Sequence, residues 1–247
     1  MMMRLSELAK VLGAPLRGAD VVFDAVSTDT RAIRRGDLFI ALKGERFDAH
    51  AFVAQAAAAG AVAAIVERPA EAAIPQIVVG NTLDALGALA RHWRGGFALP
   101  LIALTGSNGK TTVKEMLASI LRAQAGSDNV LATRGNLNNH IGVPLMLLEL
   151  RAHHRYAAIE MGMNHPGEIA QLAAIGQPTV ALVNNAQREH MEFMATVEAV
   201  AHENAAVFTA LPADGTAVVN ADDALADYFR QAAADRKSTR LLSSHGY

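Results

Sequence analysis

Short apolar runs alternate along this chain with longer stretches of helical periodicity, and the alternation begins near the N-terminus. In the first part, the Ala-rich helical stretch closes at Gly60, a typical left-handed helix end. The segment Arg94-Gly-Gly-Phe97 then has the composition of a domain boundary. The strands predicted before it span residues 21–26, 37–42, 62–66 and 76–79, and the helices span residues 49–59 and 82–93.

The second part repeats the alternation on a larger scale. The strands predicted there span residues 99–104, 130–133, 156–161, 179–183 and 216–219, and the helices span 110–125, 167–175 and 197–210. Strand–helix alternation of this kind predicts the α/β class, with a mostly parallel sheet covered by helices on both faces. We therefore expect a small N-terminal α/β domain at 1–94 and a central domain at 95–235. Ligands of such sheets bind beyond the carboxyl ends of the strands.

The strand at 99–104 runs into Thr105-Gly-Ser-Asn-Gly-Lys-Thr-Thr112, which has the features of a phosphate-binding loop before a helix N-terminus. Gly106 and Gly109 would let backbone N–H groups approach phosphate oxygens, Lys110 would supply a positive charge, and Thr111 a hydroxyl for Mg²⁺. All eight residues are predicted to bind nucleotide, with ATP and Mg²⁺ as ligands. The common longer spacing would need glycine at Leu104, which argues against ordinary GTPases. The alternative is a Gly-rich turn without a ligand.

Polar residues also follow the other predicted strands. Glu160 is the only carboxylate in the apolar run 157–163 and is a candidate metal ligand, although a solvated charge at a strand end is the alternative. His190 is a candidate ligand or a surface histidine. Asn184 and Asn185 are nucleotide candidates because they lie at the tip of a strand.

Three further loops combine hydroxyls, amides and charges. Amides in the loop 135–142 can bind sugar or peptide groups without adding charge, and turn formation is the alternative. Hydroxyls and charged groups after two N-terminal strands suit a diphosphate or a carboxylate, and a solvated loop is the alternative. The predicted substrate-binding residues are Ser27, Thr28, Asp29, Arg31, Lys43, Asp48, His50, Asn136, Asn138 and Asn139.

Composition narrows the range of functions. The formal net charge of −2 gives no electrostatic reason to expect nucleic acid as a partner. The absence of cysteine excludes disulfides, thiolate metal sites and a cysteine nucleophile, and it fits a reducing cytoplasm. The longest apolar run, 56–66, is shorter than the roughly 20 residues that cross a bilayer. We expect a soluble, cytoplasmic protein without membrane insertion, and no obligate protein partner is evident.

Taken together, the motifs resemble those of the Mur ligases, which add amino acids to the peptidoglycan precursor. The resemblance covers about residues 4 to 235, including the N-terminal segments 27–31 and 36–50. The motifs that carry it are Thr105-Gly-Ser-Asn-Gly-Lys-Thr-Thr112, Gly135-Asn-Leu-Asn-Asn139 with Ile141-Gly-Val-Pro144, Glu160-Met-Gly-Met-Asn-His165, and Ala181-Leu-Val-Asn-Asn185 with His190.

The resemblance implies a two-step reaction. Within the family the chain is most similar to members that join D-Ala-D-Ala to UDP-MurNAc-tripeptide through an acyl phosphate formed with ATP. It implies that Lys110, Glu160 and His190 are catalytic, and that Thr111, Glu160 and His190 hold metal. Another Mur ligase or a folylpolyglutamate synthase is the alternative, although the N-terminal motifs favour a UDP-sugar substrate over a folate.

Two departures from the family pattern are visible. The family's carbamylated lysine is matched here by Asn204, and we expect Glu203 or an ordered water to take over its role. The resemblance also implies a third, C-terminal domain, and residues 236–247 do not continue the family pattern. We therefore expect a truncated central domain with a non-native or disordered tail. Such a chain would bind nucleotide without turnover.

Overall fold

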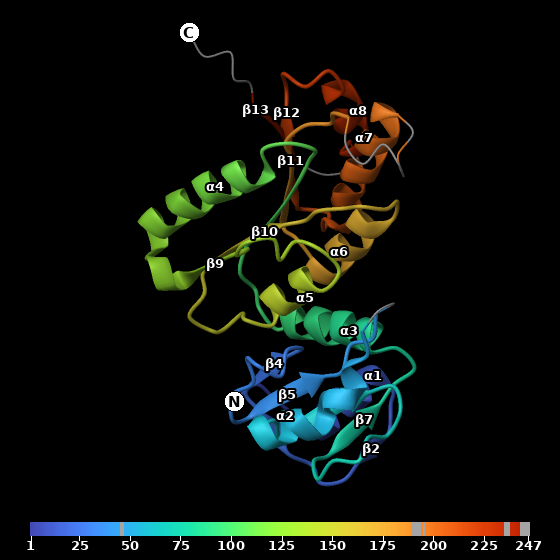
Figure 1. The fold of residues 1–247 in the computed structure, drawn as a ribbon. Helices are drawn as coiled ribbons and strands as arrows, with labels where there is room; N and C mark the ends of the chain where they lie inside the picture. Colours follow the sequence, from blue (N-terminus) through green and yellow to red (C-terminus); the bar gives the residue numbers. More distant parts are fainter. Residues whose placement is uncertain (45–46, 189–193, 195, 235–237, 243–247) are drawn as a thin grey trace. The chain divides into compact units, whose positions relative to one another are not determined.

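The computed structural model describes residues 1–44, 47–188, 194, 196–234 and 238–242. The chain divides into two compact units, Met1–Trp93 and Arg94–Tyr247, with the boundary one residue before the expected one. Each unit has its own sheet, and the elements are labelled in Figure 1. In the described part of the chain, no helix is long and apolar enough to cross a membrane.

The first unit is built on a five-stranded sheet in the order β2-β7-β6-β5-β4. Strands β4 to β7 pair in parallel, and β2 pairs antiparallel with β7. Two-residue strands β1 and β3 form a separate antiparallel pair. The bounds are β1 Met3–Arg4, α1 Leu5–Leu12, β2 Leu16–Arg17, β3 Val22–Phe23, β4 Ala25–Ser27, β5 Asp37–Ile40, η1 Ala49–Phe52, α2 Val53–Ala59, β6 Ala63–Val66, β7 Gln76–Val78 and α3 Thr82–Gly95.

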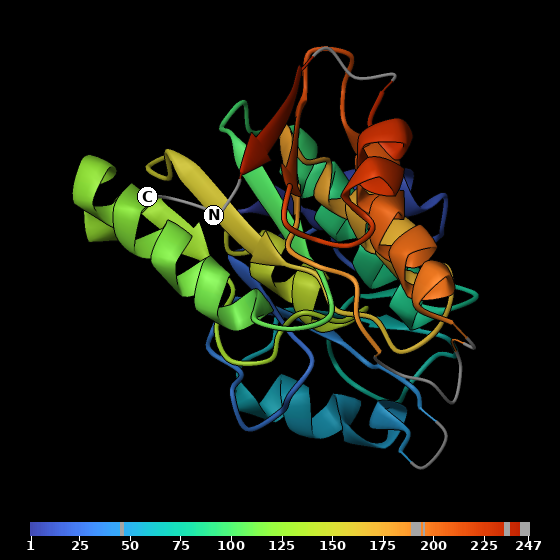
Figure 2. The same ribbon diagram turned by 90° about the horizontal axis from the view of Figure 1, so that it is seen from above.

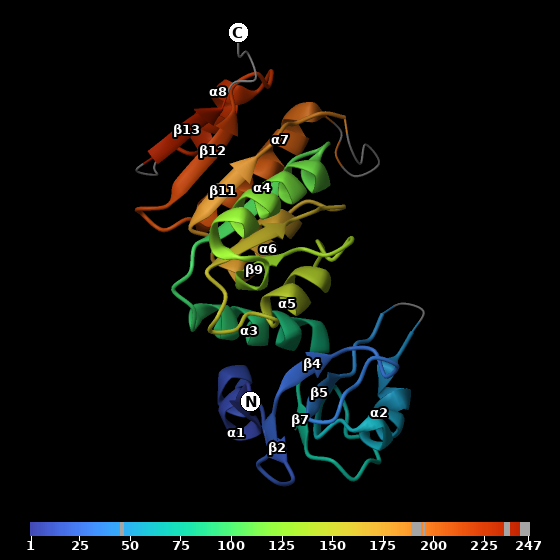
Figure 3. The ribbon, with the colours of Figure 1, turned by 90° about the vertical axis from the view of Figure 1, so that its left-hand side faces the viewer.

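Helix α2 lies beside this sheet, as Figure 3 shows. Its Val53 and Ala56 pack with Phe39 of β5 and with Ala64 and Val66 of β6 in one buried cluster. Alanines on the helix allow this close approach to the strands, because their small side chains keep the helix and sheet near each other. The helix ends at Gly60, whose left-handed backbone (φ 115°) confirms the predicted helix end.

The second unit contains a six-stranded sheet, in the order β13-β12-β11-β8-β10-β9, whose strands are all parallel. Its α/β architecture confirms the predicted fold class. The bounds are β8 Leu101–Thr105, α4 Lys110–Ala125, η2 Ser127–Asn129, β9 Val130–Ala132, α5 Gly142–Leu147, β10 Tyr156–Glu160, α6 Glu168–Gly176, β11 Val180–Val183, α7 Val197–Ala205, η3 Ala206–Ala210, β12 Thr216–Asn220, α8 Ala226–Ala232 and β13 Ser238–Leu242.

Helices cover both faces of this sheet (Figure 2), with α4 on one face and α7 and α8 on the other. On the α4 face, Ala118 and Leu121 pack against Ile102 of β8, Val130 of β9 and Ala158 of β10. All five residues of β8 are buried, so this strand runs through the core of the unit.

The strand order reverses at β8. The chain passes from β8 to β9 and β10 on one side, and then to β11 on the other side. In register, Leu104 of β8 lies between Glu160 of β10 and Leu182 of β11. A crevice opens at such a reversal beyond the carboxyl ends of the strands, which is where ligands bind in this class of sheet.

Some elements differ from those predicted. The pattern did not reveal α1 or the short helix α5, and the strand expected at 21–26 divides into β3 and β4. The expectation of an irregular tail was wrong for residues 238–242, because they form β13 and pair with β12. The pairing of a parallel edge strand is made by backbone N–H and C=O groups. It can therefore form without the alternation of apolar and polar side chains by which a sequence reveals a strand. Whether the tail is native stays a prediction.

Arg94 is a buried cation, 4% exposed, at the start of the second unit. Its guanidinium donates to the carbonyl oxygens of Phe97 (2.5 Å), Gly176 (3.1 Å) and Gln177 (3.1 Å), and it lies 3.4 Å from that of Leu99. Gly176 and Gln177 end α6, where carbonyl groups lack helical partners and the helix dipole is negative. Burial lowers the pKa of this guanidinium. Arg94 therefore ties the end of α6 to the segment leading into β8.

We expect Arg94→Met to lower the free energy of unfolding of the second unit by about 2–4 kcal/mol, because several buried carbonyl groups would lose their donor. Arg94→Lys should be intermediate, since one ammonium cannot replace the planar fork. Urea unfolding followed by circular dichroism measures the effect, and the exposed Arg91→Met is the matched control. Equal unfolding midpoints for the two methionine variants would contradict this role of Arg94.

Candidate functional site

The glycine-rich loop follows β8 directly, and α4 begins immediately after it. Gly106 (φ 138°) and Gly109 (φ 73°) both adopt left-handed backbone conformations, which other residues rarely adopt. A Cβ on Gly106 would lie 3.1 Å from Cβ of Asn184. Gly109 precedes Lys110 as the N-cap of α4. In the described part of the chain no side chain caps this 16-residue helix, so its first turn can present N–H groups to an anion, as predicted for a phosphate-binding loop.

Three polar residues of this edge are brought together around Glu160. The carboxylate is 2% exposed and lies at the end of β10. Thr111 donates its hydroxyl to Oε2 (3.1 Å), and Asn138 donates its Nδ2 to Oε1 (2.8 Å). The backbone N–H of Glu160 donates to Oγ1 of Thr133 (2.9 Å). Glu160 is thus an oriented, buried acid beside the loop, as the sequence predicted for the pair Thr111 and Glu160.

Lys110 turns back onto the loop that precedes it. Its Nζ donates to the carbonyl oxygens of Gly106 (2.6 Å) and Ser107 (2.9 Å). The ammonium therefore lies at the centre of the loop that would surround a phosphate. Rotation of a flexible lysine stem can redirect the same charge to phosphate oxygens.

The asparagines after β11 support the glycine-rich loop. Asn184 and Asn185 both donate Nδ2 to the carbonyl oxygen of Asn108 (2.6 and 3.0 Å), and Oδ1 of Asn185 accepts the Asn108 N–H (2.9 Å). Asn108 Nδ2 reaches Gln187, a residue that the sequence analysis did not identify. The expected role of Asn184 and Asn185 as nucleotide ligands stays a prediction, because these hydrogen bonds engage their side chains with the loop.

Asp223, also missed, connects a third strand end to this network. Its carboxylate accepts the N–H of Ala186 (2.9 Å) and that of Leu225 (2.8 Å). Asp223 follows β12 by a few residues, at the same edge of the sheet. Segments after β8, β11 and β12 are therefore linked by side-chain hydrogen bonds to backbone groups.

Glu203 contacts the start of α6, and its expected role, or that of an ordered water, in organising a metal stays a prediction. Its two carboxylate oxygens accept the N–H groups of Gly167 and Ile169, both at 2.8 Å, at the start of α6. An acid suits this position because the N-terminus of a helix carries positive partial charge. The side chain is 6% exposed, and each of its carboxylate oxygens accepts one of these bonds. The neighbouring Asn204 is fully buried and accepts the Thr105 hydroxyl at 2.7 Å.

The donor set near Glu160 suits Mg²⁺. This ion prefers oxygen ligands and is usually held by one or two carboxylates together with substrate phosphates and water. The Glu160 carboxylate and the Thr111 hydroxyl are such donors, and they are already in contact. No cluster of three or more His, Cys, Asp or Glu side chains that could hold a metal occurs among the described residues. His190, the third expected ligand, lies outside those residues.

The asparagines of the loop 135–142 make different contacts. Asn138 holds Glu160, whereas Asn139 accepts the N–H groups of Ile141 (3.1 Å) and Gly142 (2.9 Å) where α5 begins. Asn136 is exposed and makes no hydrogen bond with the described residues. The alternative of turn formation therefore holds for Asn139, whereas Asn136 remains a candidate for ligand contact.

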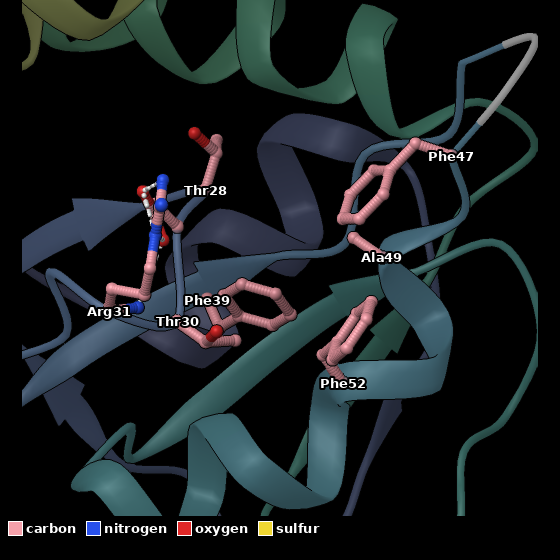
Figure 4. Close-up of a pocket in the computed structure, with 8 residues that line it drawn as sticks. Thr28, Thr30, Arg31, Phe39, Phe47, Ala49 and Phe52 are labelled. Atoms are coloured by element: carbon pink, nitrogen blue, oxygen red, sulfur yellow. Dashed lines mark hydrogen bonds and ion pairs between the residues drawn. The ribbon is translucent and has the colours of Figure 1, made fainter.

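A separate pocket lies in the first unit (Figure 4) and has a volume of about 320 Å³. Phe47 and Phe52 stack with ring centroids 5.5 Å apart and line one side, with Thr28 and Arg31 on the other. Phe47 is 56% and Phe52 36% exposed, which is unusual for large aromatic rings. Asp29, Thr30, Phe39 and Ala49 complete the lining. The sequence predicted the polar wall of this pocket and missed the aromatic one.

Asp29 holds Arg31 in place within this pocket. The guanidinium donates from Nε (2.9 Å) and Nη2 (2.6 Å), and these bonds lower the pKa of Asp29 to about 2. Nη1 makes no hydrogen bond with the described residues, so one edge of the fork stays available. Ser27 is turned inward and bonds with the backbone of Asp29 (2.9 Å).

The remaining predicted substrate residues face other groups of the protein. His50 is buried, accepts the Glu67 N–H at Nε2 (2.7 Å) and therefore donates from Nδ1 to Asp48 (2.6 Å). Hydrogen bonds from Arg68 and from His50 lower the pKa of Asp48. Lys43 is exposed, and its backbone pairs with that of Asp48 in an isolated antiparallel β-bridge. A substrate role for these three residues stays a prediction, and the contacts of His50 and Asp48 are those of a structural network.

Comparison with known proteins identifies relatives across the whole chain. UDP-N-acetylmuramoyl-tripeptide--D-alanyl-D-alanine ligase from Escherichia coli is 49% identical over 219 residues, which are 89% of this chain and 48% of that protein. A crystal structure of MurF from Acinetobacter baumannii superposes with a TM-score of 0.88 at 41% identity, covering 98% of this chain and 53% of the other. A crystal structure of MurF from Thermotoga maritima in complex with ADP superposes with a TM-score of 0.80 at 32% identity, covering 90% of this chain and 51% of the other.

The chain therefore spans about half the length of the curated relatives that it matches. Two family models match it in succession. The Mur ligase family catalytic domain matches residues 22–94, and the Mur ligase middle domain matches residues 104–246. The second match includes most of the stretch that was expected to leave the family pattern. It also covers more than half of the chain, and with it the glycine-rich loop and Glu160, so the chain belongs to the Mur ligase family.

Proposed function

We propose that this chain forms the ATP site and the precursor site of a ligase that joins D-Ala-D-Ala to UDP-MurNAc-tripeptide. The observation that carries the proposal is the group formed by Lys110, Thr111 and Glu160 at the point where the strand order reverses. Similarity to ligases of this name supports the choice of substrates.

The ATP site would work by positioning and by charge neutralisation. The open N-terminus of α4 and Lys110 would bind the phosphates, and Thr111 and Glu160 would hold Mg²⁺. When bound, Mg²⁺ supplies positive charge to the phosphate oxygens of ATP. Asn138 would keep the Glu160 carboxylate oriented, since it holds one oxygen while the other faces Thr111. The complex of a relative with ADP supports a nucleotide at this site.

In the first step, the terminal carboxylate of the precursor would attack the γ-phosphorus of ATP and release ADP. In the second step, the amine of D-Ala-D-Ala would attack the resulting acyl phosphate and release inorganic phosphate. Charge develops on transferring oxygens in both steps, and a fixed cation stabilises it more than water does. Lys110 is the residue that supplies such a charge here.

The pocket of the first unit would bind the UDP part of the precursor. Its stacked pair Phe47 and Phe52 offers an apolar face to a pyrimidine ring, and the free edge of Arg31 suits a diphosphate oxygen. Thr28 adds a hydroxyl on the same side as Arg31. Similarity to ligases whose name specifies a UDP-linked precursor supports that substrate over a folate.

Isothermal titration of the chain with ATP in the presence of Mg²⁺ tests the first site. We expect Lys110→Ala to weaken ATP binding by roughly 10- to 100-fold, because a charge-assisted hydrogen bond contributes about 1.5–3 kcal/mol. Lys10→Ala, on α1 in the first unit, is the control, and it should bind ATP like the wild type. Equal affinities for all three proteins would overturn the proposed site.

Asn138→Leu tests the orientation of Glu160. The variant removes the donor to Oε1 at nearly constant volume, and we expect about tenfold weaker Mg²⁺-dependent ATP binding, in line with the strength of a bond to a charged acceptor. Titration with ATP at several Mg²⁺ concentrations measures the effect, and the loss of ATP affinity should depend on the Mg²⁺ concentration. Gln124→Leu, exposed on α4, is the control, and a loss of the same size there would refute the specific role of Asn138.

For the precursor site, we expect Arg31→Ala to weaken UDP-MurNAc-tripeptide about tenfold, through loss of a charged donor to the diphosphate, while ATP affinity stays unchanged. Titration with UDP and with uridine separates the diphosphate from the base, because uridine should bind both proteins equally. Arg17→Ala, another exposed arginine of the same unit, is the control. Unchanged precursor affinity in Arg31→Ala would remove Arg31 from the site.

A further inference from the structure

Asn204 is a polar residue in the buried interior of the second unit. It lies near the C-terminal end of α7, is fully buried, and is flanked by the buried Val200, Val207 and Phe208. Its Oδ1 accepts the hydroxyl of Thr105 at 2.7 Å, whereas its Nδ2 has no hydrogen-bond partner among the described residues. Burial of an amide is costly unless its groups are bonded, so the contact with Thr105 offsets part of that cost.

Thr105 is the residue at which β8 becomes the glycine-rich loop. Its carbonyl oxygen accepts the N–H of Asn184 (3.0 Å), and its hydroxyl donates to Asn204. The side chain is 1% exposed, so both polar groups are fixed inside the protein. The direction in which the chain leaves β8 is therefore set by two contacts, one from the segment after β11 and one from α7.

The loop has little freedom to adjust if one contact is lost. A Cβ on Gly106 would lie 3.1 Å from Cβ and 3.2 Å from N of Asn184, which shows how closely the two backbones approach. Ser107 N–H donates to the Asn185 carbonyl (3.1 Å), one residue further along each segment. A small displacement of Thr105 is thus passed to the backbone N–H groups that follow Gly106.

We propose that Asn204 is a positioning residue for the nucleotide site, acting through the Thr105 hydroxyl on the glycine-rich loop. The inference rests on the proposed binding of ATP by that loop and adds a residue outside it. Asn204 would touch neither nucleotide nor metal. It would fix the start of the loop so that Lys110 and the first N–H groups of α4 meet the phosphates together.

The test is a double-mutant cycle with a rescue variant. Asn204→Leu and Thr105→Val each remove one side of the hydrogen bond at similar volume, and Thr105→Ser keeps the hydroxyl. We expect each of the first two to weaken ATP binding about tenfold. The double variant should bind ATP with the same affinity as the single variant that binds less tightly. Thr105→Ser should bind within about twofold of the wild type, in line with retention of the bond. His202→Leu, exposed on the same helix, is the matched control.

Isothermal titration with ATP and Mg²⁺ gives the affinities, and titration with UDP-MurNAc-tripeptide gives a second reading that should not change. If Asn204→Leu fails to fold, the comparison of Thr105→Val with Thr105→Ser carries the same test. Wild-type binding of ATP with equal affinity in Asn204→Leu, or additive losses in the double variant, would overturn this inference alone. A wild-type chain that binds no ATP would overturn the proposed function and this inference with it.

Discussion

The parallel pairing of β8 between β10 and β11 is the constraint on which the candidate nucleotide site depends. It places Leu104 beside Glu160 on one side and Leu182 on the other, so three strands end at nearly the same level. The glycine-rich loop, the acid and the asparagine segment are then neighbours although they are far apart in the sequence. A single loop could not supply all three, because α4, β9 and α5 separate β8 from β10 along the chain and α6 separates β10 from β11.

Amides do most of the positioning at this edge. The amides of Asn138, Asn184, Asn185 and Asn204 each bond with a backbone group, a hydroxyl or a carboxylate. A neutral amide fixes its neighbours without adding charge, so the field at the site is left to Lys110, Glu160 and the helix N-terminus. Two carboxylates of this unit also fix the backbone, because they accept N–H groups: Glu203 at the start of α6 and Asp223 at Ala186.

Sequence patterns predicted the parts of this structure that follow from local chemistry. The alternation of strands and helices and the left-handed glycines needed only periodicity and turn chemistry. The rule that ligands bind at strand ends placed Thr111 and Glu160 at one edge of the sheet, whereas their joint role as metal ligands was implied by the resemblance to the Mur ligases and stays a prediction. The hydrogen-bond partners of polar side chains were not predictable, because the sequence around Asn184 is the same whether its side chain contacts a nucleotide or the Asn108 carbonyl. The same ambiguity affected Glu203, whose buried contact with α6 depends on how two helices pack. The aromatic wall of Phe47 and Phe52 was missed because exposed phenylalanines carry no periodic signal.

The proposed precursor site contains an ion pair whose charge does not change near neutral pH. In the first unit, Arg31 lowers the pKa of Asp29 to about 2, below the ordinary carboxyl value. A lowered carboxyl pKa means that the contribution of the pair is present above the unfolded pKa and is lost as the pH falls through about 2. Arg31 therefore stays held by an ionised partner throughout the neutral range. Any change in precursor affinity near neutral pH must then come from groups outside this pair.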